Sequence, residues 1–121
     1  MKKIVYVLTQ DPREKCEMIS SALAQALTAI SFGYECEIFL SDNGVKLILP
    51  EYIAGLKAGA FDSLAELLDY CGTMGGKIYA CNPSLNSRDI DVDKIISGIT
   101  GLVNASKLIE SSMEADVVFT Y

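Results

Sequence analysis

Thiols are the groups of this sequence best suited to nucleophilic chemistry. The chain contains no histidine, so Ser-His-Asp and Cys-His catalysis cannot be assembled within it. Histidine-based zinc sites are excluded for the same reason. No two cysteines form a CxxC pair, which disfavours a zinc knuckle or a dithiol redox centre. We therefore expect no metal site. The cysteines are Cys16, Cys36, Cys71 and Cys81.

Cys81 stands where a thiol could take part in chemistry. It ends a predicted strand, Lys77–Cys81, and a helix is expected to start after Asn82 and Pro83. A free thiol has a pKa of about 8.5, and the positive end of a helix dipole favours the thiolate. Downstream, Arg88 can fold back toward a thiolate or a bound anion. This pattern suits a cysteine that holds sulfane sulfur as a persulfide. The alternative is a buried, inert residue, because cysteine is often buried.

The other cysteines are weaker candidates. Cys36 lies within a predicted strand, where a core or partner-facing position is expected. Cys71 precedes the strand that Cys81 ends, so the two lie at opposite ends and a disulfide between them is not expected. Cys16 begins a helix at the edge where Cys81 lies, and is interpreted either as a resolving thiol or as a packing residue.

Alternating strand and helix patterns position these residues. Strands separated by helices form parallel βαβ units. The sequence therefore predicts an α/β fold, a three-layer α/β/α sandwich with a five-stranded parallel sheet, as one domain over residues 1–121. The predicted strands are Ile4–Leu8, Glu35–Leu40, Lys77–Cys81, Gly101–Val103 and Asp116–Thr120. The predicted helices are Arg13–Phe32, a short piece at Val45–Leu49, one from Ser63 to near Gly75, and Ala105–Met113.

Ligands of such sheets bind outside the carboxyl ends of the strands. At this edge the turn after the second predicted strand contains Asp42 and Gly44, and the segment after the third contains Asn82, Ser84 and Arg88. We expect these residues to line the site around Cys81 and to bind an anion or a thiolate. No glycine-rich phosphate motif is present, and no cofactor is predicted.

The segment Val45–Ile53 is more apolar than a surface loop. It could pack on its own sheet or meet a neighbouring subunit. For a small protein we expect the neighbouring subunit, since a large exposed apolar patch is typical of an interface.

The composition and net charge of the chain indicate which classes of partner this protein can bind. The chain has 121 residues, 50% of them hydrophobic, with 10 basic and 16 acidic side chains and a net charge of −6. This charge argues against nucleic acid or an anionic membrane as the partner. No apolar run is long enough to span a membrane and no signal peptide is evident, so we expect a cytoplasmic protein with reduced thiols.

The order of these motifs resembles the DsrE/DsrF-like family, the small α/β proteins related to sulfur-relay subunits. Four segments carry the resemblance over nearly the whole chain: the alanine-rich helix that ends at Gly33, then Glu37–Val45, Ser63–Cys81 and Gly101–Thr120. The resemblance implies a parallel five-stranded sheet, oligomers that are often trimers or hexamers, and intracellular sulfur transfer.

The resemblance also implies a role for Cys81, which occupies the position of the family's functional cysteine after the third strand. Active members carry an Arg-Arg-Gly stretch a few residues later. Here Arg88 matches one position of that stretch, and Ser87 and Asp89 replace its neighbours.

Two functional hypotheses follow. The first is an intracellular sulfur carrier that accepts and passes on sulfane sulfur through a persulfide on Cys81, with sulfur-donor and sulfur-acceptor proteins as partners. Its activity would be sulfurtransferase-like trans-persulfidation. The alternative is a non-catalytic, oligomeric binding or assembly module that holds a small anion or nucleotide at the same strand ends.

Overall fold

Five parallel strands form one sheet in the computed structural model, which describes residues 1–96 and 98–121. The strand order is β4-β3-β2-β1-β5, so the first strand of the sequence lies inside the sheet and the last forms an edge. The strands are β1 (Lys3–Leu8), β2 (Glu35–Leu40), β3 (Lys77–Cys81), β4 (Gly101–Val103) and β5 (Val117–Thr120). The predicted sheet is confirmed, with strand bounds that differ from the predicted ones by a residue at most.

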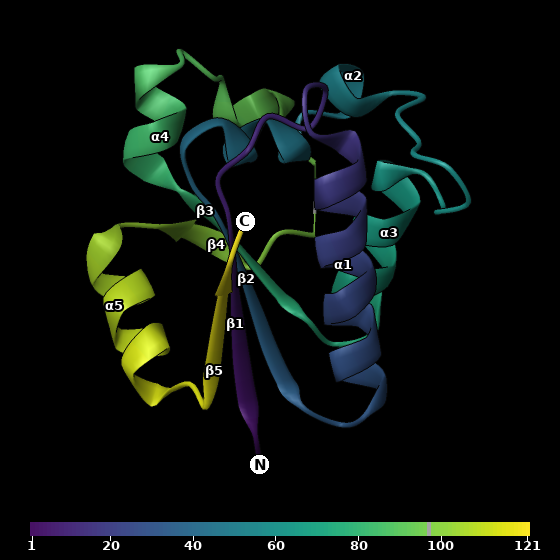
Figure 1. Cartoon of the computed structure of the whole chain (residues 1–121). Helices are drawn as coiled ribbons and strands as arrows, with labels where there is room; N and C mark the ends of the chain where they lie inside the picture. The colour runs from purple at the N-terminus through teal and green to yellow at the C-terminus, as the bar shows by residue number, and fades with distance from the viewer. Residues whose placement is uncertain (97) are drawn as a thin grey trace.

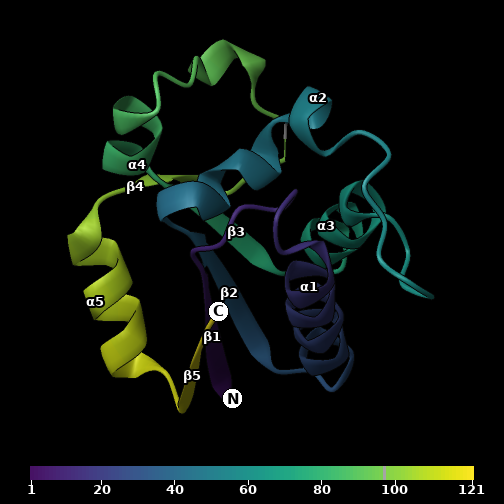
Figure 2. The same cartoon turned by 45° about the horizontal axis from the view of Figure 1, so that its top comes forward.

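Helices cover both faces of this sheet, as Figures 1 and 2 show. Helices α1 (Cys16–Ser31) and α3 (Leu64–Thr73) lie on one face, and α5 (Ala105–Glu114) lies on the other. The predicted α/β/α sandwich is therefore confirmed. Ser63 caps α3 as its sequence pattern predicts, because its hydroxyl accepts the Glu66 backbone N–H at 3.2 Å.

The two faces carry cores of different size. The larger core lies under α1 and α3 and includes the fully buried Leu23, Ile38 and Leu68. The smaller core lies under α5 and is formed by buried residues of the central strands. Alternate residues of a strand point to opposite faces, which is why strands enclosed by helices on both sides are apolar throughout. The smaller core consists of Val5, Val7, Phe39 and Tyr79.

The apolar segment after β2 packs into its own chain. It forms a 3-10 helix, η1 (Asp42–Ile48), followed by α2 (Pro50–Ile53). Val45 and Ile48 are fully buried in the larger core. The expectation that Val45–Ile53 meets a neighbouring subunit is therefore wrong. Val45, Leu47, Ile48 and Ile53 are buried and not available to a partner, whereas Leu49 is partly buried and Pro50 is exposed.

Gly44 allows η1 to approach the end of β1. A Cβ atom at this position would lie 2.0 Å from the carbonyl oxygen of Leu8, whereas one at Gly101 would meet nothing within 4 Å. A methyl group at Gly44 would thus force backbone atoms apart.

We expect Gly44→Ala to lower the free energy of unfolding by about 1–3 kcal/mol or more, the usual cost of overpacking. Gly101→Ala, the matched control, is expected to have almost no effect. Urea denaturation of the two variants measures both values. A Gly44→Ala protein as stable as the wild type would contradict the close approach.

The connection from β3 to β4 combines short helical segments. Helix α4 (Asn82–Ser87) follows β3 directly, so the helical turn expected in the polar segment after Cys81 is present. The 3-10 helix η2 (Val92–Lys94) follows, and the carboxylate of Asp91 caps it by accepting the Asp93 backbone N–H at 2.9 Å. Within the described residues, no helix is both long and apolar enough to cross a membrane.

Candidate functional site

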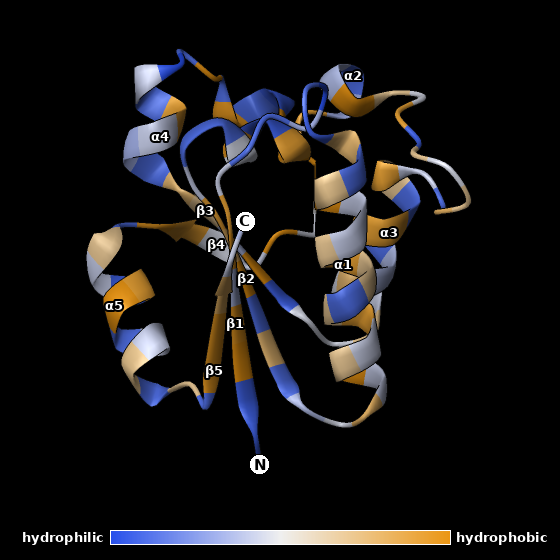
Figure 3. Cartoon of the chain, viewed as in Figure 1, coloured by the Kyte–Doolittle hydropathy of each residue, from blue (hydrophilic) through white to orange (hydrophobic). Residues whose placement is uncertain are grey.

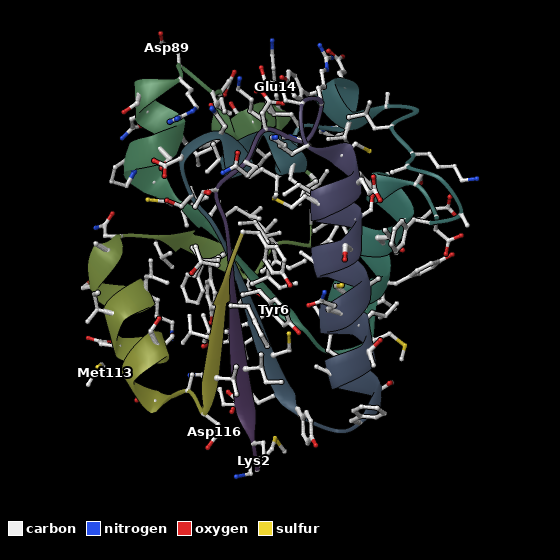
Figure 4. The ribbon with its side chains drawn as sticks, in the orientation of Figure 1. Lys2, Tyr6, Glu14, Asp89, Met113 and Asp116 are labelled. Carbon is white, nitrogen blue, oxygen red and sulfur yellow. The ribbon has the colours of Figure 1, made fainter. Side chains whose placement is uncertain are left out.

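The carboxyl ends of the strands form one edge of the sheet, at the top in Figure 1. Glu14, before α1, and Asp89, after α4, lie at this edge in Figure 4, and Lys2 and Asp116 lie at the opposite one. Cys81 is the last residue of β3 and the N-cap of α4. Its side chain is partly exposed and packs against the larger core.

Hydrogen bonds fasten α4 to the turn between β2 and η1. The Asp42 backbone N–H donates to the Ser84 hydroxyl at 3.0 Å. Arg88 donates from Nε to the Asn43 side-chain oxygen at 2.9 Å, and from Nη1 to the Ser84 carbonyl at 3.1 Å. The Arg88 side chain therefore reaches back along α4 to Ser84 and across to the turn that follows β2. Two segments far apart in the sequence are thus held together beside the thiol.

The predicted site residues contribute to this edge of the sheet in different ways. Asp42, Ser84 and Arg88 take part in the hydrogen bonds that join α4 to the turn, and Asn82 is the first residue of α4. Gly44 uses its backbone N–H to donate to the Ser41 carbonyl at 2.8 Å, so its contribution is the close approach to β1.

Asn43 is a contributor that sequence reasoning missed. It lies in the Ser-Asp-Asn-Gly turn, whose residue types signal a turn but not a partner for Arg88. Its neighbour Asp42 has a φ of 51°, a left-handed conformation that aspartate tolerates better than most residues. The turn thereby directs the Asp42 N–H and the Asn43 side chain toward α4.

Burial separates Cys36 and Cys71 from the other two thiols. Burial raises the pKa of Cys36 to about 12 and that of Cys71 to about 11. Both therefore stay protonated near neutral pH and are poor nucleophiles. The structure puts Cys36 in the core, one of the two positions expected for it. Cys16 and Cys81 are partly exposed, and all four cysteines are free thiols.

The acidic side chain of Asp11, at this edge, is held in a hydrogen-bond network. Asp11 is buried and accepts the Tyr52 hydroxyl at 2.8 Å and Lys46 Nζ at 3.3 Å. Burial by itself raises the pKa of Asp11, but hydrogen bonds from Tyr52, Arg13 and Lys46 lower it below its ordinary value. Among the residues that the structure describes, no group of three or more His, Cys, Asp or Glu side chains could hold a metal ion.

Two proteins are similar to this chain in sequence over nearly its whole length. A 119-residue alignment with an uncharacterised protein of Methanocaldococcus jannaschii is 31% identical and covers 98% of this chain and 99% of that protein. An uncharacterised protein of Methanopyrus kandleri is 30% identical over 118 residues, covering 98% and 93% of the two chains.

Solved structures show the same fold at lower identity. The crystal structure of the ychN protein of E. coli superposes with a TM-score of 0.83 at 22% identity and covers 100% of both chains. A protein of unknown function from Methanobacterium thermoautotrophicum gives a TM-score of 0.74 at 14% identity, again over 100% of both chains. The DsrE/DsrF-like family matches residues 2–121. The chain therefore belongs to the DsrE/DsrF-like family.

Proposed function

We propose that this chain is a cytoplasmic sulfur carrier that accepts sulfane sulfur as a persulfide on Cys81 and passes it to another thiol. The observation that carries the proposal is the position of Cys81, a partly exposed thiol at the edge of the sheet formed by the carboxyl ends of the strands. Membership of a family associated with sulfur relay supports the same reading. The four free thiols suit the reducing cytoplasm.

The proposed step moves one sulfur atom without net oxidation. The Cys81 thiolate attacks the outer sulfur of a donor persulfide, and a new S–S bond forms at Cys81. The donor's S–S bond breaks, and its electron pair leaves on the donor thiolate. The outer sulfur keeps its own proton or negative charge. An acceptor thiolate then repeats the exchange on the loaded Cys81, so donor and acceptor proteins are the partners.

Residues after β2 and β3 support the proposal because they hold a positive charge at the edge of the sheet where Cys81 lies. The guanidinium of Arg88 is held between α4 and the turn after β2 by the Ser84 carbonyl and the Asn43 side-chain oxygen. In the proposed carrier, its positive charge is the group that would stabilise a persulfide anion on Cys81. The turn built by Asp42 and Gly44, and the start of α4 at Asn82, position the Arg88 side chain. No further reactant is required, so the activity is trans-persulfidation.

Cyanide releases carried sulfane sulfur as thiocyanate and so tests the function directly. The wild-type protein is exposed to polysulfide, freed of small molecules and treated with cyanide. We expect close to one equivalent of thiocyanate per chain. A yield no higher than that of protein never exposed to polysulfide would contradict the proposal and favour the binding or assembly module.

Exposed apolar side chains on α5 and β5 support a homo-oligomer, a trimer or hexamer of this chain. Figures 1 and 2 place the helix and the edge strand side by side, and Figure 3 shows apolar segments on both. Ile109 is 61% exposed and Met113 82% exposed, and Met113 points outward in Figure 4. An edge strand also offers unpaired backbone groups to a second copy. The α5–β5 surface comprises Ile109, Met113 and Val118. Val117 and Phe119 point to the opposite face of the sheet, where Phe119 stacks on Tyr6.

Ile109→Asp is expected to shift this oligomer toward the monomer, because a carboxylate would be buried at the contact. Val92→Asp is the matched control, since Val92 is an exposed apolar residue outside the α5–β5 surface. Sedimentation velocity at equal concentrations compares the variants. A wild-type monomer, or equal dissociation of both variants, would contradict the assignment of this surface.

A further inference from the structure

A cavity lies among the segments that follow the carboxyl ends of the strands, and Cys81 is not among the residues that line it. Its volume is about 670 Å³, and three segments of the chain contribute to it. Arg13 comes from the loop between β1 and α1, Tyr52 from α2 and Lys94 from η2. The remaining lining residues are Leu49, Pro50 and Glu51.

Tyr52 fixes the plane of the Arg13 guanidinium. The Arg13 Cζ atom lies 3.8 Å from the centre of the Tyr52 ring, a cation–π contact. Arg13 Nε also donates to the Tyr52 carbonyl at 2.9 Å. Within residues 1–96 and 98–121, the two terminal nitrogens of Arg13 form no hydrogen bond. They remain as a planar pair of donors at the cavity.

Asp11 holds the Tyr52 side chain in place through hydrogen bonds. The Tyr52 hydroxyl donates to both carboxylate oxygens of Asp11, at 3.0 and 2.8 Å. The Arg13 backbone N–H donates to the same carboxylate at 2.8 Å, and Lys46 Nζ lies 3.3 Å from it. The charge of this buried carboxylate is thus matched by Lys46 and by hydrogen bonds. The positive charge of Arg13 remains available to a ligand.

The cavity is locally cationic in a chain whose net charge is −6. Arg13 and Lys94 outnumber the one acidic residue that lines it, Glu51. A planar guanidinium binds two oxygens of a phosphate-type group at once, and a lysine adds a mobile point charge. Leu49 and Pro50 add an apolar wall, which suits an organic body beside the charged group.

We infer that this cavity binds a small molecule bearing a tetrahedral oxyanion, with Arg13 and Lys94 as its cationic ligands and Tyr52 as the support for Arg13. The group is a phosphate, sulfonate or thiosulfate, either free or attached to a small organic body. This site is separate from Cys81, and its occupancy does not depend on the persulfide.

NMR titration of the full chain with inorganic phosphate and with phenyl phosphate, at constant ionic strength, tests the inference. Saturable shifts are expected at the backbone amides of Arg13, Leu49, Glu51, Tyr52 and Lys94. Arg13→Gln and Lys94→Gln are each expected to weaken binding about tenfold or more. Lys77→Gln, which removes an exposed lysine at the opposite edge, is expected to bind as the wild type does. Tighter binding of phenyl phosphate would assign the organic source, and equal binding the free oxyanion.

Two further variants test whether the oxyanion binds in this cavity and whether its binding is independent of Cys81. Glu51→Gln is expected to tighten binding severalfold, because it removes the opposing charge. Cys81→Ser is expected to leave binding unchanged, so failure of the sulfur-carrier proposal would not affect this result. Shifts that do not saturate, that centre on Arg88, or that persist equally in Arg13→Gln would overturn the inference.

Discussion

Replacing Lys3 by methionine is expected to lower the free energy of unfolding by about 3–5 kcal/mol, the usual cost of breaking a buried ion pair. The Lys3 Nζ lies 2.9 Å from Glu37 Oε1, and the two side chains are 10% and 2% exposed. Methionine keeps the aliphatic stem but leaves Glu37 charged and without its cation between β2 and α5. Chemical denaturation measures the loss.

Two control variants distinguish this cost from a general effect of removing a lysine. Lys2→Met removes an exposed lysine beside Asp116, and a change below about 0.5 kcal/mol is expected, as for most surface substitutions. Combining Lys3→Met with Glu37→Met is expected to recover much of the lost stability, because no unpaired charge then remains. A double variant less stable than Lys3→Met alone would contradict this account of the pair.

The same ion pair predicts how stability depends on pH. Burial by itself raises the pKa of Glu37, but the hydrogen bond and the charge of Lys3 lower it below its ordinary value. A lowered folded-state pKa stabilises the protein above the unfolded-state pKa, and this contribution is lost as the pH falls through the folded value. Lys3→Met is therefore expected to weaken the acid dependence of stability.

Replacing Cys81 by serine is expected to abolish sulfur loading. Exposure to polysulfide should add about 32 Da, one sulfur atom, to the intact wild-type chain and nothing to Cys81→Ser. Serine is nearly isosteric and Cys81 is only partly buried, so the fold is expected to persist. Circular dichroism of the variant checks this.

Cys16→Ser is the matched control for this experiment, because Cys16 is the other partly exposed thiol. It is expected to load as the wild type does. Equal loading of the Cys81 and Cys16 variants would show that Cys81 has no special reactivity. Cys36 and Cys71 are not expected to compete, since burial raises their pKa values to about 12 and about 11.

Local patterns were sufficient to predict the strands and main helices of this fold. Each strand is a short and mostly apolar run between turn signals, and the helix α1 repeats its apolar residues at the spacing of one face. Cys81 could be placed at the carboxyl edge of the sheet because the sequence pattern correctly predicts that β3 ends at this residue. The placement of Val45–Ile53 failed because an apolar pattern reports burial but not whether the same chain or a partner provides it.

Contacts between distant segments could not be predicted from one sequence. Arg88 forms a hydrogen bond with Asn43, and Tyr52 forms one with Asp11. Both are possible because parallel strands bring their carboxyl ends to one edge of the sheet. Neither pair has a spacing signal, since each joins residues about 40 positions apart in different connections between strands. The strand order that determines these neighbours is itself a property of the whole sheet.

Peptide mapping of the wild-type chain after exposure to less than one equivalent of polysulfide tests the central claim most directly. The persulfide is trapped by alkylation, and every cysteine peptide is quantified by mass spectrometry. We expect the added sulfur on the peptide that contains Cys81, with little on Cys16. Sulfur spread evenly over the cysteines, or concentrated on Cys16, would contradict the assignment of Cys81 as the sulfur carrier.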